Sequence, residues 1–246
     1  EHMKGKIRGA EFIVAVPTDI TDVEKRAFFE MFYKSKLKPK SVLLCEKPIA
    51  DAVGLGLDVN EPTGIMVVDI GADTTEISVI SLGGLVLSDL LHFGGNRIDE
   101  SIITYVKRTY NLVIGQKTAQ ALKEKLGSGI PGNTETMVIV GRDVVSGLPI
   151  EMEITGEVVY EAIKDNLNSI CNSIKMILEK TPPELAADVA DRGIVLTGGG
   201  ALLRGLEELI EDRTGINTMT ADDPMTCVAI GTGKYVEFLS GKRDDD

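Results

Sequence analysis

Two apolar segments of the chain end in glycine-containing turns, which limit the possible folds more than any other feature. They read "VVDIGADTTE" at residues 67–76 and "IVLTGGGALL" at residues 194–203. Successive backbone N–H groups in such a turn form a concave site for phosphate oxygens, and a carboxylate at the strand end can hold Mg²⁺ through water. The second turn precedes a predicted helix, whose N-terminus favours anions. From the residues alone, an ordinary hairpin and a tight strand-to-helix connection remain equally good interpretations.

The second turn does not match the dinucleotide-binding fingerprint. That pattern, G-x-G-x-x-G, needs glycine at its sixth position, and Leu203 stands there. The apolar segments at 64–70, 75–81 and 85–93 follow one another closely, with Gly83-Gly84 between the last two. They predict an antiparallel meander, which also disfavours a Rossmann fold.

The first third of the chain alternates between the two kinds of secondary structure. Strands are predicted at 12–17 and 41–46. Thr21 and Glu24 form a capping box for the helix between them, and Pro48 opens a second, short helix. Five apolar residues share one face of the first helix: Val23, Ala27, Phe28, Met31 and Phe32. This strand-helix-strand-helix order is typical of a parallel sheet.

The middle of the chain is mainly helical. A helix is predicted over 97–113 from the spacing of Ile98, Ile102, Val106 and Val113. A second helix over 117–127 stops at Gly127, and a hairpin follows at 135–155. An amphipathic helix over 157–180 ends at Pro182-Pro183, and after the second glycine turn a last helix is predicted near 227–239.

Charge and composition exclude several classes of function. The 246 residues carry a formal net charge of −12, and no stretch gathers five or more lysines or arginines, so nucleic-acid binding is not expected. No apolar run reaches the length of a membrane span, and the N-terminal residues lack a signal-peptide core, which predicts a cytoplasmic protein. Cys45, Cys171 and Cys227 stand alone among apolar neighbours, so buried, reduced thiols are expected.

Six motifs, taken in order along the chain, resemble those of one protein superfamily. They read "EKPIADAVG", "DIGADTTE", "GGNRIDE", "KEKLG", "TGGGALLRGL" and "DDPMTCVAIGTG". Their order resembles that of the actin-like ATPases, and the last two are similar almost letter for letter to motifs of the MreB family of bacterial cell-shape proteins. The resemblance runs from about Phe12 to Leu239. It implies an α/β fold of the actin-like (ribonuclease H-like) ATPase class, incomplete at the N-terminus and with an inserted helical subdomain.

The resemblance also implies a division into parts. Residues 1–60 would be the C-terminal remnant of a first actin-like domain. Residues 61–95 and 191–225 would form the core sheet of the second domain, with its phosphate and adenosine loops. Residues 96–190 would be the inserted small helical subdomain, and 226–246 the closing helix and tail. The family's first phosphate loop has no counterpart here, so the chain resembles the family fold without its first part.

Site residues follow from the resemblance by position. Asp69 would hold Mg²⁺ through water and orient the attacking water, with Thr74 as a second catalytic residue. The other nucleotide contacts would come from the phosphate turn, the start of the inserted subdomain, the "KEKL" segment and the adenosine loop: Gly71, Ala72, Asp73, Thr74, Gly95, Asn96, Arg97, Lys123, Glu124, Gly198, Gly199 and Gly200.

Two departures from the family pattern affect the expected chemistry. Lys47 stands where the family's "EEP" has the glutamate that orients the hydrolytic water. An ammonium group donates but cannot accept a hydrogen bond, and Glu46, one residue earlier on a strand end, should point the other way. Asp73 stands in a turn that reads "GGGTT" in the family, where it repels a triphosphate by about 1–4 kcal/mol unless a metal ion intervenes. Nucleotide binding with slow hydrolysis is therefore expected.

The function implied by the resemblance is structural: a cytoplasmic filament subunit for cell-shape determination that binds ATP or ADP with Mg²⁺, with at most weak ATPase activity. Its implied partners are further copies of itself, a conventional MreB paralogue, cell-wall synthesis proteins and, through the missing N-terminal region, the inner face of the membrane. Two alternatives remain open. One is a degenerate paralogue that regulates or caps MreB filaments, and the other is a fragment of a DnaK-type ATP-driven chaperone.

Overall fold

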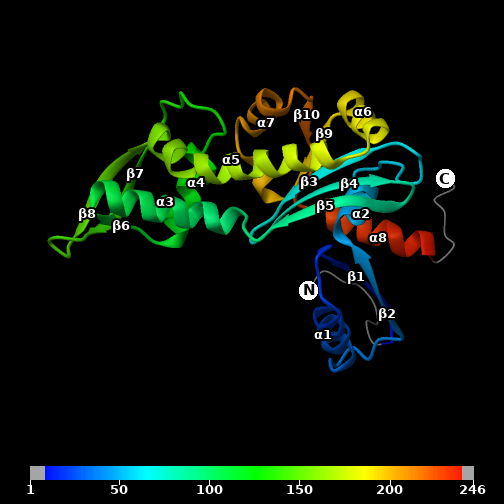
Figure 1. Ribbon diagram of the computed structural model, residues 1–246. Coiled ribbons are helices and arrows are strands. Elements are labelled where there is room, and N and C mark those ends of the chain that lie inside the picture. The colour runs from blue at the N-terminus through cyan, green and yellow to red at the C-terminus, as the bar shows by residue number, and fades with distance from the viewer. Residues whose placement is uncertain (1–8, 240–246) are drawn as a thin grey trace.

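The computed structural model of the chain describes residues 9–239 (Figure 1). The described part opens with four elements: β1 (Glu11–Val16), α1 (Asp22–Tyr33), β2 (Ser41–Glu46) and α2 (Lys47–Gly54). β1 and β2 pair in parallel, which confirms the strand-helix-strand-helix prediction. The capping box is also confirmed, because the Glu24 N–H donates to the Thr21 hydroxyl and the Thr21 N–H donates to the Glu24 carboxylate.

A five-stranded sheet forms the centre of the molecule, with strand order β10-β9-β3-β4-β5. Its members are β3 (Ile65–Ile70), β4 (Thr75–Ser81), β5 (Gly84–Leu91), β9 (Ile194–Thr197) and β10 (Thr218–Thr220). β3, β4 and β5 form the predicted antiparallel meander. β9 pairs with β3 in parallel although residues 71–193 separate them in the chain. This pairing brings the two glycine turns to the same end of the sheet.

Most of the residues between β5 and β9 form a second body beside the sheet (Figure 1). It contains α3 (Gly95–Tyr110), β6 (Leu112–Val113), α4 (Gln116–Leu126), β7 (Thr136–Asp143) and β8 (Pro149–Thr155). α5 (Gly156–Lys180) starts in this body, and α6 (Pro183–Arg192), which follows it, lies against the central sheet beside β3. β6, β7 and β8 make a small antiparallel sheet. α5 contacts β8 at one end and β4 and β5 further along, so it ties this body to the central sheet.

Three details differ from the sequence-based expectations. The helix predicted over 97–113 ends at Tyr110, because Asn111 adopts a left-handed conformation with φ of 54° and Val113 joins strand β6. α6 was not predicted, because a proline pair reads as a helix stop although Pro183 occupies the first turn of a new helix. β10 has three residues, too few to give a periodic signal.

The two faces of the central sheet pack against different partners. One face carries Met66, Val68 and Ile70 into a large core shared with α3, α4 and α5. The other face carries Ile65 and Val67 into a smaller core shared with α2. After β9 the chain forms the short helix η1 (Gly199–Leu202), α7 (Leu206–Thr214) and, last, α8 (Cys227–Leu239), which packs closely against α2.

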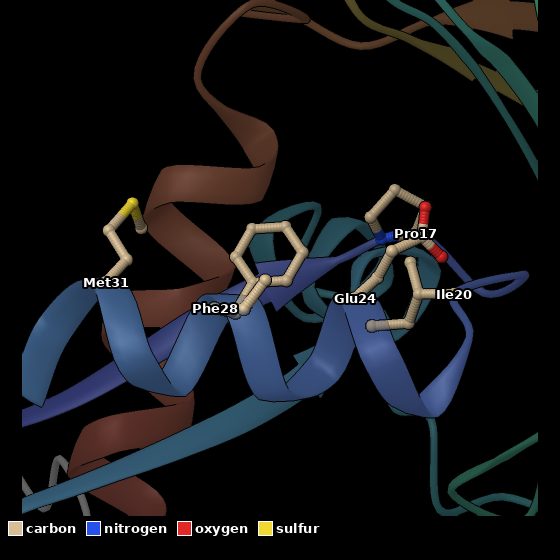
Figure 2. A pocket seen from close by; sticks show the side chains of 6 residues that line it. Pro17, Ile20, Glu24, Phe28 and Met31 are labelled. Carbon is tan, nitrogen blue, oxygen red and sulfur yellow. The ribbon is translucent and has the colours of Figure 1, made fainter.

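The apolar face of α1 is only partly covered by the described residues. No residue of α1 is buried, although the Phe32 ring packs on Phe12 with the ring centroids 5.2 Å apart. Val23 is 75% exposed and Met31 57% exposed. A shallow hollow of about 400 Å³ runs along this face, lined by Pro17, Ile20, Glu24, Ala27, Phe28 and Met31 (Figure 2). The predicted apolar stripe is therefore present on α1 but does not enter a core here.

Two further predictions concern single residues and the membrane. Cys45, Cys171 and Cys227 are buried and unpaired, as expected for reduced thiols. Among residues 9–239, no helix has the length and apolar character needed to cross a lipid bilayer.

Candidate functional site

A row of three polar side chains crosses the central sheet at the end where both glycine turns begin. Asp69 on β3 lies opposite Thr197 on β9 and opposite Glu76 on β4. Residues opposite one another on neighbouring strands point to the same face. All three are buried, on the face that α2 covers. Such a row at the edge of an apolar core is costly unless another element supplies polar partners.

α2 supplies Lys47 and Asp51, which lie one helical turn apart and therefore on the same side of the helix. The Lys47 ammonium lies 2.7 Å from Oδ2 of Asp69, and the two side chains are 18% and 5% exposed. Asp51 is fully buried, and neither of its carboxyl oxygens has a hydrogen-bond partner within normal geometry among the described residues. Glu46 is exposed, as the strand alternation predicted. One ammonium thus faces several carboxyl groups.

Two of the buried carboxyl groups, Asp51 and Glu76, have raised pKa values. Burial, and next the negative charge of Asp69, raises the pKa of Asp51 to about 9, although Lys47 opposes the shift. Burial also raises the pKa of Glu76, against hydrogen bonds from Thr18. The Thr18 N–H and hydroxyl donate to Oε1 of Glu76 at 2.9 and 2.5 Å. At neutral pH Asp51 is therefore protonated, and the net charge of the group is smaller than its composition implies.

Replacing Asp51 by Asn should remove a pH-dependent loss of stability. Because the folded-state pKa of Asp51, about 9, exceeds the unfolded value of about 3.9, the folded protein binds more protons between these values. Its stability then falls as pH rises through that window, by at most about 1.4 kcal/mol per pH unit. Urea unfolding at pH 5 and pH 8 should show that the free energy of unfolding of the variant, relative to that of wild type, is higher at pH 8 than at pH 5. Asp19→Asn, at an exposed position, is the control, and an equal gain there would contradict the prediction.

The phosphate turn predicted at residues 71–74 is closed and braced by backbone hydrogen bonds. Gly71 N donates to Thr74 O at 2.9 Å, and Asn96 N donates to Ala72 O at 2.8 Å. The Asn96 side chain donates to Oδ1 of Asp73 at 2.8 Å, which holds that exposed carboxylate toward α3. The Lys47 ammonium and the Thr74 hydroxyl lie 3.9 and 4.0 Å from the point where a Cβ on Gly71 would sit. Lys47 therefore borders this turn as well as Asp69.

The second glycine turn packs directly on the first strand end. Gly198 has φ of +79°, and a Cβ there would overlap Oδ1 of Asp69 and the carbonyl oxygen of Ile70. A Cβ on Gly200 would overlap the Ile70 side chain, whereas one on Gly199 would meet open space. Close packing therefore accounts for glycine at 198 and 200 without a ligand, and Gly199 is the position that leaves the backbone open.

The remaining predicted contacts fall into two groups. Lys123 is brought to the start of α3, where its ammonium donates to Gly95 O at 3.0 Å and pairs with Asp99 at 2.8 Å. Arg97 pairs with Glu100 at 2.9 Å, and Gln120 donates to the exposed Glu124 at 2.8 Å. These side-chain partners of Arg97 and Glu124 thus lie on their own helices. Their predicted contacts with a nucleotide remain predictions.

The donors present do not fit a divalent ion at Asp69. One carboxylate oxygen is paired with Lys47, and the other faces the Gly198 backbone. Two like unit charges about 4 Å apart repel each other by about 4 kcal/mol at an effective dielectric of 20. Because a divalent ion carries two charges, its repulsion from the Lys47 ammonium at this distance would be about twice as large. Within residues 9–239, no three His, Cys, Asp or Glu side chains are grouped as a metal site. The arrangement fits an ammonium group as the cation.

Sequence reasoning missed Asp51, Glu76, Thr18 and Thr197. Asp51 carried a usable signal, because it stands one helical turn after Lys47 at a position where the family pattern "EEPxAAAIG" has alanine. A carboxyl group that appears together with an exchange of acid for base at this spacing indicates a local charge compensation. Thr18 and Thr197 carried no such signal.

Comparison with known proteins places the chain in a family. A sequence model of the family described as "MreB/Mbl protein" matches residues 1–243. The chain is 45% identical over 228 residues to the cell shape-determining protein MreB of Escherichia coli (strain K12), covering 92% of this chain and 65% of that protein. It is 42% identical over 239 residues to the cell shape-determining protein Mbl of Bacillus subtilis (strain 168), covering 97% and 71%. The chain thus spans less than two thirds of the E. coli relative.

Solved structures agree in fold. The crystal structure of MreB5 of Spiroplasma citri bound to AMPPNP superimposes with a TM-score of 0.92 at 33% identity, covering 98% of this chain and 72% of that one. The MamK double helical filament has a TM-score of 0.77 at 25% identity, covering 92% and 68%. The fold is therefore actin-like, and the chain belongs to the MreB/Mbl protein family.

Proposed function

We propose that the protein is a nucleotide-binding subunit of a bacterial cytoskeletal filament that takes part in cell-shape determination. The observation that carries the proposal is the match to the MreB/Mbl family over residues 1–243. Relatives in that family are named for cell-shape determination. One similar structure is bound to AMPPNP, another to ADP, and a third is a double helical filament. The parts of the chain would follow the division given above, with 96–190 as the inserted subdomain.

The proposed nucleotide site lies where the two glycine turns meet. Residues 71–74 would contact the phosphates, and Gly199 would let the adenosine approach the backbone after β9. Support comes from the contact between the turns, with Gly198 packed on Asp69 and Ile70. Asn96 and Lys123 would serve mainly to hold the turn and the start of α3, because their side chains are bound to Asp73 and to Gly95 and Asp99.

Hydrolysis by this site is proposed to be slow. A water that attacks a phosphate needs an acceptor for its proton, and the Lys47 ammonium offers donors alone. Asp69 is the other candidate acceptor, but one of its carboxylate oxygens is paired with that ammonium at 2.7 Å. The bound nucleotide would then favour filament assembly as a ligand, and its hydrolysis would contribute little to filament turnover.

Sedimentation and electron microscopy of the full-length protein test the filament proposal. Protein with ATP, with ADP and without nucleotide is spun at high speed, and the pellets are imaged after negative staining. Filaments whose critical concentration is lowest with ATP are expected. A protein that stays monomeric over the accessible concentration range in all three conditions would overturn the proposal.

A second candidate function is regulation or capping of filaments formed by a conventional MreB. The observation that favours it is the Lys47–Asp69 pair, which removes an acceptor and occupies an acid in the same site. Mixing the protein at substoichiometric amounts with a conventional MreB separates the two. A capping protein shortens the partner's filaments and forms none alone, whereas a filament subunit assembles by itself.

A further inference from the structure

We propose that Lys47 replaces the divalent cation in this site, so that the protein binds ATP without Mg²⁺. The ammonium of Lys47, held in place by Asp69, would be the positive charge that faces the phosphates. The inference rests on the proposed function, because it concerns the ligand of the same site. It adds a property that family membership does not supply, since the position carries glutamate in the family pattern.

The first argument is where the ammonium lies. It is 2.7 Å from Oδ2 of Asp69 and 3.9 Å from the Cβ position of Gly71, so it lies between the acid and the phosphate turn. An ammonium has three N–H donors, and the pair with Asp69 is the one ion pair of Lys47 within the described residues. Its other donors would then be offered to phosphate oxygens. The 18% exposure of the side chain means that a ligand in the turn could reach it.

The second argument is the surrounding charge. Asp51 from α2, Asp69 from β3 and Glu76 from β4 all face Lys47, and all three are buried. The Asp69 carboxylate pairs with the ammonium and disfavours its departure. Without the ammonium, a polyphosphate would face this negative charge directly. Lys47 also begins α2, and the helix N-terminus adds a favourable field for anions on the same side.

The third argument is that a metal ion and the ammonium compete for the same carboxylate. An ion at Asp69 would have to displace Lys47 from a largely buried pair or sit beside it at the same acid. Either event opposes metal binding, whereas a phosphate oxygen that approaches the ammonium completes its coordination. The nucleotide would therefore bind as free ATP, with its charge met by the protein.

Calorimetric titration of ATP into the full-length protein, in EDTA and in excess Mg²⁺, tests the inference. Wild type should bind ATP in EDTA with an affinity within about threefold of that in Mg²⁺. Lys47→Met should weaken ATP binding in EDTA by about 10- to 100-fold, the value of a charge-assisted hydrogen bond. Mg²⁺ should restore part of the lost affinity of this variant, because Asp69 no longer pairs with an ammonium. Lys180→Met, at an exposed site at the end of α5, should behave as wild type.

A second variant keeps the test decisive if Lys47→Met alone fails to fold with Asp69 unpaired. Lys47→Met with Asp69→Asn leaves no buried charge in the pair, and it should bind ATP weakly both in EDTA and in Mg²⁺. Wild-type binding that requires Mg²⁺ would overturn the inference and leave nucleotide binding intact. Absence of ATP binding in both buffers would overturn the inference together with the proposed function.

Discussion

Replacing Lys47 by Glu together with Asp51 by Ala should raise the rate of phosphate release from bound ATP by about 10²- to 10⁴-fold. The double change restores the residues of the family pattern "EEPxAAAIG" at positions 47 and 51, at the start of α2 and one turn later. A carboxylate at position 47 can accept a hydrogen bond from the attacking water, which the ammonium cannot. Loss of the Lys47 pair also frees Oδ2 of Asp69. Single-turnover phosphate release in Mg²⁺-containing buffer measures the gain.

The single variants separate the causes. Lys47→Glu alone would set a new carboxylate beside Asp51, Asp69 and Glu76 with no cation among them, so it should be less stable and gain less rate than the double variant. Asp51→Ala alone keeps the ammonium and should hydrolyse ATP as slowly as wild type. Lys180→Glu makes the same change in net charge as Lys47→Glu and is its control, and Lys180→Met is the control for the smaller change in the double variant. A double variant that is folded, binds ATP and is no faster than wild type would show that Lys47 does not limit hydrolysis.

The local parts of the fold were predictable because each depends on neighbouring residues. The capping box at Thr21 and Glu24 needs only the spacing of those two residues. The turn after Asp69 was predictable because a short apolar run ends there and glycine follows, and both neighbouring strands are buried along their whole length. α6 was not predicted because the proline pair at 182–183, which follows the end of α5 at Lys180, also opens α6. The partial exposure of the apolar face of α1 could not be foreseen, since an apolar stripe predicts packing but does not identify what packs on it.

The candidate site was predictable in its backbone but not in its pairing. Gly71, Gly198 and Asp69 could be located from the sequence, since glycine turns after apolar strands are local patterns. The pair between Lys47 and Asp69 depends on how α2 lies across β3, and that placement results from long-range packing. Lys47 was recognised as an unusual residue, yet nothing in its neighbours indicated that it would occupy the acid expected to hold a metal ion.

The placement of α2, and with it Lys47, depends on the close crossing of α2 and α8. This crossing predicts that replacing two glycines of α8 by alanine has opposite effects on stability. A Cβ on Gly231 would overlap the carbonyl oxygen of Ala50 and lie 2.7 Å from the Gly54 nitrogen, whereas a Cβ on Gly233 would meet nothing within 4 Å. The obstacles at Gly231 are backbone atoms of α2, which cannot rotate away, so the helices must separate.

Gly231→Ala should therefore lower the free energy of unfolding by about 3 kcal/mol, the upper end of the range for overpacking. This cost is larger than the small gain in helix propensity that alanine brings. Gly233→Ala should raise it by about 0.5–1 kcal/mol, because alanine is the better helix former and meets no obstacle. Urea unfolding followed by circular dichroism measures both. Because a displaced α2 moves Lys47 away from Asp69, Gly231→Ala should also weaken ATP binding in EDTA, whereas Gly233→Ala should not. Equal stability of the two variants would mean that α2 and α8 do not cross as closely as described, and the position of Lys47 would then lose its structural basis.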